Sequence, residues 1–328
     1  MADEVIRVAG LTHRFDELVA VDGVSFSVSA GEVFSFLGPN GAGKSTVINI
    51  LTTLLPMQDG EVVIAGRDLR TEPDHVREAI GIVFQEVTLD RDMTVAETLE
   101  FHGRLYGLPR EERQASIDEL VGLVELEAKR DTLTKYLSGG MKRRLEIARG
   151  LMTRPTILFL DEPTIGLDPQ TRARMWDYLR QVNREGTTIF LTTHYMDEAD
   201  QLSNRIAIID YGRIVAEGRP YELKNALGQD LIYLETADNA RARAVLEGTP
   251  NVGAIHEKGG GLLVMVADDG TRVLPHMLDA LRTENVAVTG INMKKPSMDD
   301  VFIHHTGREL RDERAENVAT AVNRAGKH

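Results

Sequence analysis

A glycine-rich loop between a short strand and a helix constrains this chain more than any other feature of its sequence. Residues 38–46 read Gly-Pro-Asn-Gly-Ala-Gly-Lys-Ser-Thr and fit the pattern G-x-x-x-x-G-K-[ST]. The β-prone run 33–37 precedes the loop, and residues 45–55 are predicted to be helical. The backbone N–H groups of such a loop surround phosphate groups, and the helix N-terminus adds a favourable dipole. The pattern therefore predicts phosphate binding by Gly38, Pro39, Asn40, Gly41, Ala42, Gly43, Lys44, Ser45 and Thr46.

Two side chains of this loop have specific expected roles. Lys44 is expected to neutralise the β- and γ-phosphates of a nucleotide, and the Ser45 hydroxyl to bind Mg²⁺. The alternative is a glycine turn without function. A chain of this length matches the pattern by chance with a probability of about 1%, and the strand–loop–helix context lowers that value further.

A second apolar run, residues 157–160, ends in the acidic pair Asp161-Glu162. Folds of this kind present a carboxylate to the magnesium ion at the end of a buried strand, which is the role expected for Asp161. Glu162 is placed to act as a general base toward an attacking water. The alternative is a strand that ends in solvated acids, and the acidic pair is informative only because a phosphate loop precedes it.

A second helix N-terminus follows residues 137–141, Leu-Ser-Gly-Gly-Met. Ser138 is a natural N-cap, and Met141, Leu145, Ala148 and Met152 share one helical face. The exposed amides of Gly139 and Gly140 make this a second potential anion site in a chain with one phosphate loop. The alternative, a capped helix after a glycine turn, leaves the presence of two such sites unexplained.

Composition excludes several classes of function. The chain has 38 Lys and Arg against 51 Asp and Glu, a net charge of −13, which disfavours binding to a nucleic-acid backbone. The absence of cysteine excludes disulfides, thiolate catalysis and cysteine-ligated zinc. The longest apolar runs have the length of strands, so no membrane span is expected. The acidic start does not resemble a signal peptide, and we expect a cytosolic protein whose membrane role depends on a partner.

The order of elements indicates two kinds of domain. In the first part, near-continuous apolar strands (33–37, 156–160 and 187–192) alternate with helices (95–106 and 111–126), which predicts an α/β layer structure. After residue 229 the expected order is βαββαβ, with strands at 231–235, 251–256, 262–266 and 286–293 and helices at 238–247 and 271–283. That order is the ferredoxin-like α+β arrangement.

Together, these motifs resemble the ATP-binding subunit of an ABC transporter. The resemblance covers residues 5–220 or so and continues in family order with Phe15 as the adenine-stacking aromatic, Gln85, Asp168 after Gly166-Leu167, and His194. It implies a P-loop NTPase fold of ABC type, with a RecA-like core and a helical subdomain at about 86–155. We expect the ATP-binding domain at 1–229, a C-terminal accessory or dimerisation domain at 230–307, and a polar tail at 308–328.

The resemblance also implies ATP and Mg²⁺ as ligands and a head-to-tail homodimer. Each ATP would lie between the phosphate loop of one subunit and Ser138, Gly139 and Gly140 of the other, with Asp168 reaching across the interface. Glu162, His194 and Gln85 would form the catalytic group, and Ser45, Gln85 and Asp161 the magnesium site.

Three positions depart from the family pattern. Phe15 replaces the more common Tyr, Met141 stands where Gln is usual, and the bulky Ile165 precedes Asp168. The groups expected to touch phosphate are intact. We therefore expect a competent ATPase with a somewhat looser preference for adenine and altered communication between the two sites.

Residues 295–303 and Thr306-Gly307 resemble the closing motif of daunorubicin-resistance-type exporters. This branch implies an ABC-2 type permease encoded as a separate chain, export of a drug, antibiotic or lipid-like substrate, and a peripheral location on the cytoplasmic face of the membrane. The alternatives are an ABC-type ATPase not coupled to transport and the ATPase of an importer. The permease is expected to dock on residues 86–106, where Phe101, Leu105 and Tyr106 are either exposed contacts or part of the helical core.

Overall fold

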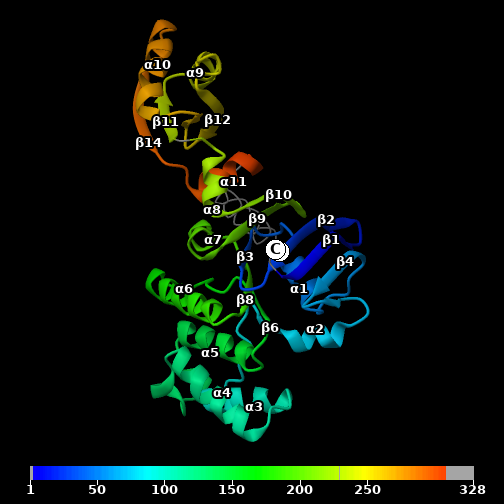
Figure 1. Cartoon of the computed structure of the whole chain (residues 1–328). Helices are drawn as coiled ribbons and strands as arrows, with labels where there is room; N and C mark the ends of the chain where they lie inside the picture. The colour runs from blue at the N-terminus through cyan, green and yellow to red at the C-terminus, as the bar shows by residue number, and fades with distance from the viewer. Residues whose placement is uncertain (1–2, 229, 308–328) are drawn as a thin grey trace, which may run out of the picture. The chain divides into compact units, whose positions relative to one another are not determined.

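The computed structural model describes residues 3–228 and 230–307, and the predicted polar tail lies outside them (Figure 1). The chain forms two compact units that divide between Val215 and Ala216. The domain boundary expected after residue 229 remains a prediction.

A six-stranded sheet forms the centre of the first unit, in the order β10-β9-β3-β8-β7-β6. Its strands are β3 (Val33–Leu37), β6 (Ile80–Val83), β7 (Ile157–Asp161), β8 (Thr188–Thr193), β9 (Arg205–Asp210) and β10 (Arg213–Gly218). Strands β6, β7, β8, β3 and β9 run parallel, and every residue of β3 and β8 is buried. This burial on both faces explains their continuous apolar sequences and confirms the predicted α/β layers.

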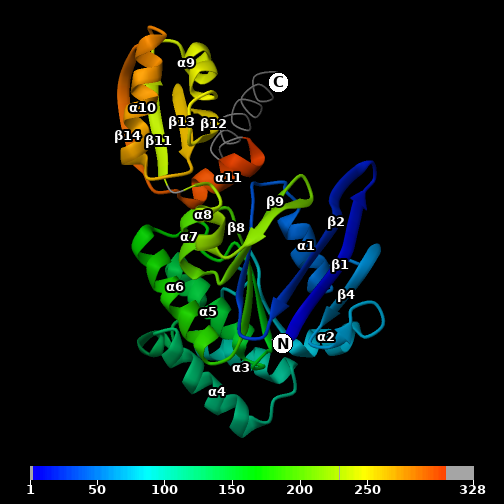
Figure 2. The same ribbon diagram turned by 45° about the horizontal axis from the view of Figure 1, so that its top comes forward.

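A smaller antiparallel sheet has the order β2-β1-β4-β5, formed by β1 (Glu4–Phe15), β2 (Leu18–Ser29), β4 (Asp59–Ile64) and β5 (Arg67–Asp68). Helix α1 (Lys44–Leu51) packs against β2, β7 and β8 and so lies between the two sheets, as Figure 2 shows. It ends earlier than the predicted residue 55, because Thr53 has a left-handed backbone with φ of 64°. Helix α2 (Pro73–Ala79) follows β5.

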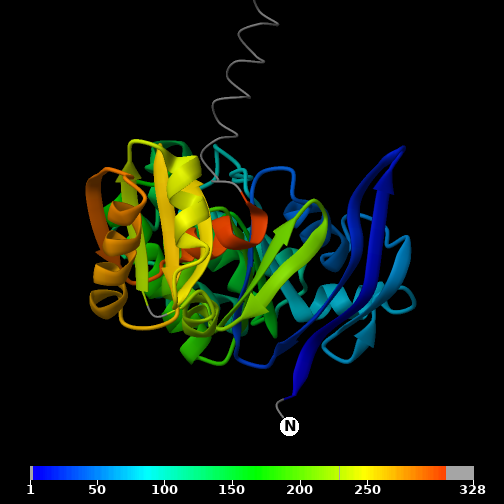
Figure 3. The same cartoon turned by 90° about the horizontal axis from the view of Figure 1, so that it is seen from above.

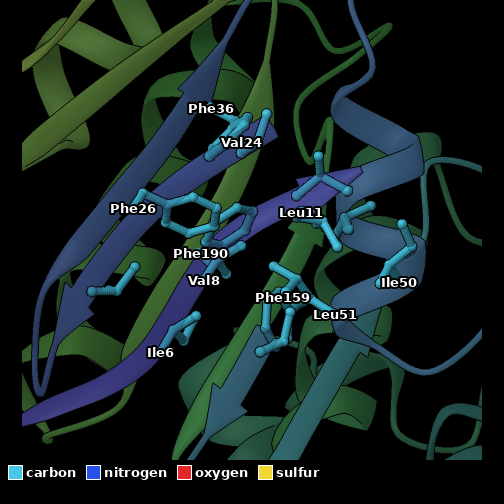
Figure 4. Close-up of a cluster of buried hydrophobic side chains, with 14 of the residues drawn as sticks. Ile6, Val8, Leu11, Val24, Phe26, Phe36, Ile50, Leu51, Phe159 and Phe190 are labelled. Atoms are coloured by element: carbon cyan, nitrogen blue, oxygen red, sulfur yellow. The ribbon is translucent and has the colours of Figure 1, made fainter. Parts of the chain in front are cut away.

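Aromatic rings fill the space between these two sheets. Phe26, Phe34, Phe36, Phe159 and Phe190 contact one another with ring centroids 5.0–6.0 Å apart, and Figure 4 shows part of this cluster. The rings come from β2, β3, β7 and β8. This core therefore holds β3, which precedes the phosphate loop, in a fixed position relative to β7, which ends at the acidic pair.

Helices cover the other side of the central sheet. Helices α6 (Pro169–Arg184) and α7 (Met196–Leu202) pack on β8, and α3 (Val95–Leu105), α4 (Arg110–Leu123) and α5 (Gly139–Leu151) pack together as the helical subdomain. The 3₁₀ turns η1 (Glu127–Lys129) and η2 (Thr134–Tyr136) connect α4 to α5. The predicted helices at 95–106 and 111–126 are confirmed, although α4 stops at Leu123, where Glu125 takes a positive φ of 53°.

The second unit, coloured yellow and orange in Figure 3, has the predicted ferredoxin-like fold. After α8 (Pro220–Asn225) come β11 (Asp230–Thr236), α9 (Asn239–Leu246), β12 (Val252–Lys258), β13 (Gly261–Val266), α10 (Gly270–Thr283), β14 (Val288–Lys294) and α11 (Met298–Thr306). The sheet order is β12-β13-β11-β14, and every neighbouring pair is antiparallel. Its apolar side chains pack against α9 and α10.

The motif at 295–307 forms the start and body of α11. Ser297 caps the helix through the backbone N–H of Asp300, and the fully buried Asp300 carboxylate accepts a 2.6 Å hydrogen bond from Lys294. Within the described residues, no helix combines the length and the apolar character that a membrane crossing requires.

We predict that Phe190→Ala destabilises the first unit by about 3–5 kcal/mol, because it removes the ring that contacts four other buried rings. Phe101→Ala, at a side chain that is 50% exposed, should cost less than about 1 kcal/mol. Urea unfolding followed by fluorescence of Trp176, the one tryptophan of the chain, measures both values. Equal losses in the two variants would show that the aromatic cluster is not the main support of this unit.

Candidate nucleotide-binding site

The phosphate loop joins the end of β3 to the start of α1, as predicted. Gly43 caps α1 with a φ of 102°, and a Cβ atom there would lie 2.4 Å from the Ala20 carbonyl oxygen. The loop is therefore pressed against the antiparallel sheet so closely that only glycine fits. The Ala42 carbonyl also accepts a 3.0 Å hydrogen bond from the Gly212 N–H. Backbone contacts with neighbouring segments thus fix the conformation of the loop without a bound ligand.

A cavity of about 530 Å³ opens beside this loop. Nine of the predicted site residues line it, namely Phe15, Asn40, Gly41, Gly43, Lys44, Ser45, Thr46, Gln85 and Glu162. Phe15 is 45% exposed, and His13 contacts its ring at a centroid distance of 4.7 Å, so the ring remains accessible for stacking. The lining also includes Ile165, one of the three departures from the family pattern, and residues that the sequence did not indicate, among them Ala20 and Tyr211.

Lys44 is buried at the floor of the cavity. Its Nζ atom donates hydrogen bonds of 2.8 Å and 2.9 Å to the carbonyl oxygens of Gly38 and Pro39. It also lies 3.4 Å from Oε1 of Glu162. The lysine cation is therefore fixed between the loop and the carboxylate strand, where phosphate groups would meet it.

Asp161 ends strand β7 next to the loop. Its carboxylate accepts a hydrogen bond from the Thr192 hydroxyl, and the Ser45 hydroxyl lies beside it. Burial raises the pKa of Asp161, and the nearby charge of Glu162 acts in the same direction, while both hydroxyl groups and Lys44 oppose this shift. The structure thus brings Asp161 and Ser45 together, as the predicted magnesium site requires.

Glu162 is only 6% exposed and is held from two sides. Oε2 accepts a 3.0 Å hydrogen bond from Nδ1 of His194, and Oε1 faces Lys44. Burial alone would raise the pKa of Glu162, but the hydrogen bond from His194 and the charge of Lys44 outweigh it and lower the pKa. Glu162 is therefore ionised at neutral pH, which is the form of a carboxylate that can accept a proton.

The second predicted anion site lies at the start of α5. The Ser138 hydroxyl accepts a 3.3 Å hydrogen bond from the Met141 N–H, and Ser138 and Gly139 are exposed. Asp168 caps α6 by accepting hydrogen bonds from the N–H groups of Gln170 and Thr171. In the described part of the chain, Ser138, Gly139, Gly140 and Asp168 lie outside the lining of the cavity. One chain thus carries the two predicted anion sites separately.

Sequence reasoning missed two buried residues that support the acidic pair. Thr192 of β8 accepts a hydrogen bond from the Glu162 N–H and donates one to Asp161. Arg143 of α5 donates to the backbone carbonyl oxygens of both acidic residues. A polar residue inside the apolar run of β8 was the available signal for Thr192. Arg143 stands in a run of three basic residues, which by itself resembles a solvated helix face.

The donor set next to the loop fits a magnesium ion. It consists of a hydroxyl, a carboxylate and an exposed carboxamide, from Ser45, Asp161 and Gln85, and Mg²⁺ prefers such oxygen ligands. Gln85 lines the same cavity as Ser45. The residues present could therefore hold a magnesium–nucleotide complex.

We predict that the stabilising effect of the Glu162 carboxylate depends on pH. Its pKa in the folded chain lies below the ordinary value, so the ionised form stabilises the fold above the unfolded pKa, and this effect disappears as the pH falls through the folded pKa. Glu162→Gln should therefore be less stable than the wild type at pH 7, by about 1–3 kcal/mol, and the difference should shrink at about pH 3.5.

Urea unfolding of both proteins at the two pH values measures this difference. A variant that is as stable as the wild type at pH 7, or a difference that grows in acid, would contradict the assignment of an ionised, paired Glu162.

Comparison with known proteins places the chain in a family. Residues 21–165 match the family described as ABC transporter, and residues 218–306 match the family described as ATP-binding protein DrrA1-3-like, C-terminal domain. A daunorubicin resistance ATP-binding protein of Streptomyces coeruleorubidus is 39% identical over 312 residues, which are 95% of this chain and 98% of the relative. A Nod factor export ATP-binding protein I of Ralstonia nicotianae is 38% identical over 94% of this chain and 95% of the relative.

A solved structure of similar fold is the dimeric post-hydrolysis state of an ATP-binding cassette bound to ADP and Pi. Its TM-score is 0.59 at 30% identity, covering 65% of this chain and 98% of that chain. These findings confirm the expected family, the phosphate-loop ATPase fold and ATP as the nucleotide. The chain is an ATP-hydrolysing subunit of an ABC exporter, and it belongs to the family of ABC transporter ATP-binding proteins, with the daunorubicin-resistance proteins among its relatives.

Proposed function

We propose that Glu162 is the general base of ATP hydrolysis in this chain. The observation that carries the proposal is the position of the Glu162 carboxylate, which lines the cavity and is held by Lys44 on one oxygen and by His194 on the other. Glu162 would accept a proton from the attacking water, and Lys44 would hold the phosphate charge. Because Nδ1 of His194 donates to Glu162, the ring is held by one nitrogen and its Nε2 is the atom that remains for a contact with phosphate or water. The remaining loop residues and Phe15 would bind the phosphates and the adenine ring.

Magnesium would be held by Ser45, Asp161 and Gln85 together with phosphate oxygens. When bound, the ion neutralises charge on the phosphates. The position of the Ser45 hydroxyl beside the Asp161 carboxylate supports this set, because two of the three proposed ligands lie side by side. Gln85 would in addition sense whether magnesium and the attacking water are bound, and would transmit this state to the membrane permease.

We further propose a head-to-tail homodimer in which each ATP lies between two chains. Ser138, Gly139 and Gly140 form an exposed or half-exposed helix N-terminus outside the chain's own cavity. Such an N-terminus binds phosphate, so a second chain is the natural source of the phosphate it would bind. The dimeric form of the similar cassette supports the same arrangement. Asp168 would face the partner from the start of α6.

A membrane permease would bind beside α3. Phe101, Leu105 and Tyr106 are 50%, 66% and 56% exposed, so of the two alternatives left open by the sequence, the exposed one is observed. Tyr106 lines a cleft of about 540 Å³ together with Phe84 and Arg149. His102 lines the same cleft, and burial and the charge of Arg149 lower its pKa to about 4. An exposed apolar helix end beside a cleft lined by arginine supports docking of a partner segment with apolar and acidic side chains.

The partner would be an ABC-2 type permease in a separate chain, which would place this chain on the cytoplasmic face of the membrane. The relatives are described as conferring daunorubicin resistance or exporting Nod factor. We therefore propose that the exported substrate is a drug, antibiotic or lipid-like molecule. The net charge of −13 supports the absence of a nucleic-acid partner.

We predict that Glu162→Gln lowers the rate of ATP hydrolysis about 10²–10⁴-fold while ATP binding is retained, because only the proton acceptor is lost. Glu111→Gln, at an exposed position in the first turn of α4, is the matched control and should keep the wild-type rate. Phosphate release with the permease co-expressed, with and without EDTA, measures the rate and its dependence on magnesium.

Uptake of a fluorescent drug into inverted vesicles from the same cells tests transport. Uptake that requires the wild-type Glu162 would support an exporter motor. A Glu162→Gln variant that hydrolyses ATP at more than a tenth of the wild-type rate would contradict the assigned general base. Strong hydrolysis that does not respond to the permease would instead favour an ATPase that is not coupled to transport.

A further inference from the structure

One buried arginine connects helix α5 to the end of strand β7, where the acidic pair lies. Arg143 lies on α5, four residues after Gly139, and its side chain is 5% exposed. Its guanidinium group donates hydrogen bonds to four backbone carbonyl oxygens, those of Phe84, Asp161 (3.0 Å), Glu162 (3.1 Å) and Pro163 (2.7 Å). Three of these carbonyls belong to consecutive residues at the end of β7. A planar group with five fixed donors can bridge such a set, whereas a lysine ammonium group cannot.

The segment that contains Gln85 is anchored to the same helix at both ends. Arg143 binds the carbonyl oxygen of Phe84 on one side of Gln85. On the other side, the fully buried Glu146 accepts a 2.8 Å hydrogen bond from the Thr88 N–H, and Arg149 donates a 2.8 Å bond to the Thr88 hydroxyl. Glu146 also pairs with Arg143 at 3.1 Å. A shift of α5 would therefore move both anchors of the Gln85 segment.

The backbone of Glu162 depends on the same contact. Glu162 has a left-handed conformation with φ of 47°, which is unfavourable for a residue with a side chain. Its N–H donates to the carbonyl and hydroxyl oxygens of Thr192, each at 3.1 Å, and its carbonyl accepts from Arg143. The direction in which the carboxylate points is thus set by a strained backbone that β8 and α5 hold from opposite sides.

We propose that Arg143 is a positioning residue that couples the N-terminus of α5 to Glu162 and Gln85 of the same chain. The inference rests on the proposed roles of Glu162 and Gln85. Phosphate binding at Ser138–Gly140 would pull on α5, and Arg143 transmits that displacement to the general base and to the Gln85 segment. Arg143 does not line the nucleotide cavity, so it acts on the rate of the chemical step and not on binding of the nucleotide.

Arg143→Lys is the test, because it keeps the positive charge beside Glu146 and removes the fork that spans the carbonyl groups. Arg144→Lys is the matched control at the next position of the same helix. Arg144 is also largely buried, at 14% exposure, and binds the Val124 carbonyl and the Tyr178 hydroxyl, away from the acidic pair. Both variants are made in the full chain and co-expressed with the permease.

We expect Arg143→Lys to lower kcat for ATP hydrolysis at least about tenfold, with the Kd for a fluorescent ATP analogue within about twofold of the wild type. Arg144→Lys should keep kcat within about twofold at a similar melting temperature. If Arg143→Lys fails to fold, the double variant Arg143→Gln/Glu146→Gln, which removes both buried charges together, is measured in the same way. A kcat that stays at the wild-type value, or that falls only with the folded fraction, overturns the proposal.

Glu162→Gln measured in parallel separates this inference from the proposed function. If Glu162→Gln is inactive and Arg143→Lys is fully active, the proposed role of Arg143 is contradicted, while the general base assignment stands. If Glu162→Gln is active, the assignment of Glu162 as general base is contradicted. The coupling of α5 to Glu162 through Arg143 then loses its basis as well.

Discussion

The ionised carboxylate of Glu162 is the group on which the rest of the site depends. Removing a charge from water costs several kcal/mol, so a buried carboxylate stays charged only where close partners compensate. Lys44 and His194 supply that compensation, and they come from the phosphate loop and from the segment after β8. Three parallel strands must therefore end at the same edge of the sheet in fixed register. The aromatic core beneath them, from Phe26 to Phe190, provides that rigidity.

In the proposed dimer, the N-termini of two helices, α1 and α5, each bind phosphate. The start of α1 belongs to the cavity of the chain itself, whereas the start of α5 lies outside that cavity. This separation is what the proposed dimer requires, because a second chain would supply the phosphate bound at the start of α5. In that proposal α5 has two roles: its first residues face the partner, while Arg143 and Glu146 bind the segments that carry Glu162 and Gln85 in the same chain.

Most of the fold and nine of the residues that line the cavity could be predicted from the sequence, because the loop, the acidic pair and the βαββαβ order have strict local patterns. Helix ends were less predictable, since α1 and α4 both stop where a single residue takes a positive φ. The exposure of Phe101, Leu105 and Tyr106 could not be predicted, because an apolar helix face looks the same in a core and in a docking surface. The role of Arg143 depends on tertiary contacts with backbone carbonyls, which leave no mark on sequence.

The central claim is that each complete ATP site combines two chains, and subunit mixing tests it most directly. Lys44→Ala disables the phosphate loop, and Ser138→Arg blocks the start of α5. A mixed dimer of the two variants would carry one site with both halves intact, so a 1:1 mixture contains about a quarter of the normal sites. We predict that each variant alone is inactive and that mixing restores part of the ATP hydrolysis. Full activity of Ser138→Arg alone, or no recovery in the mixture, would contradict the shared site.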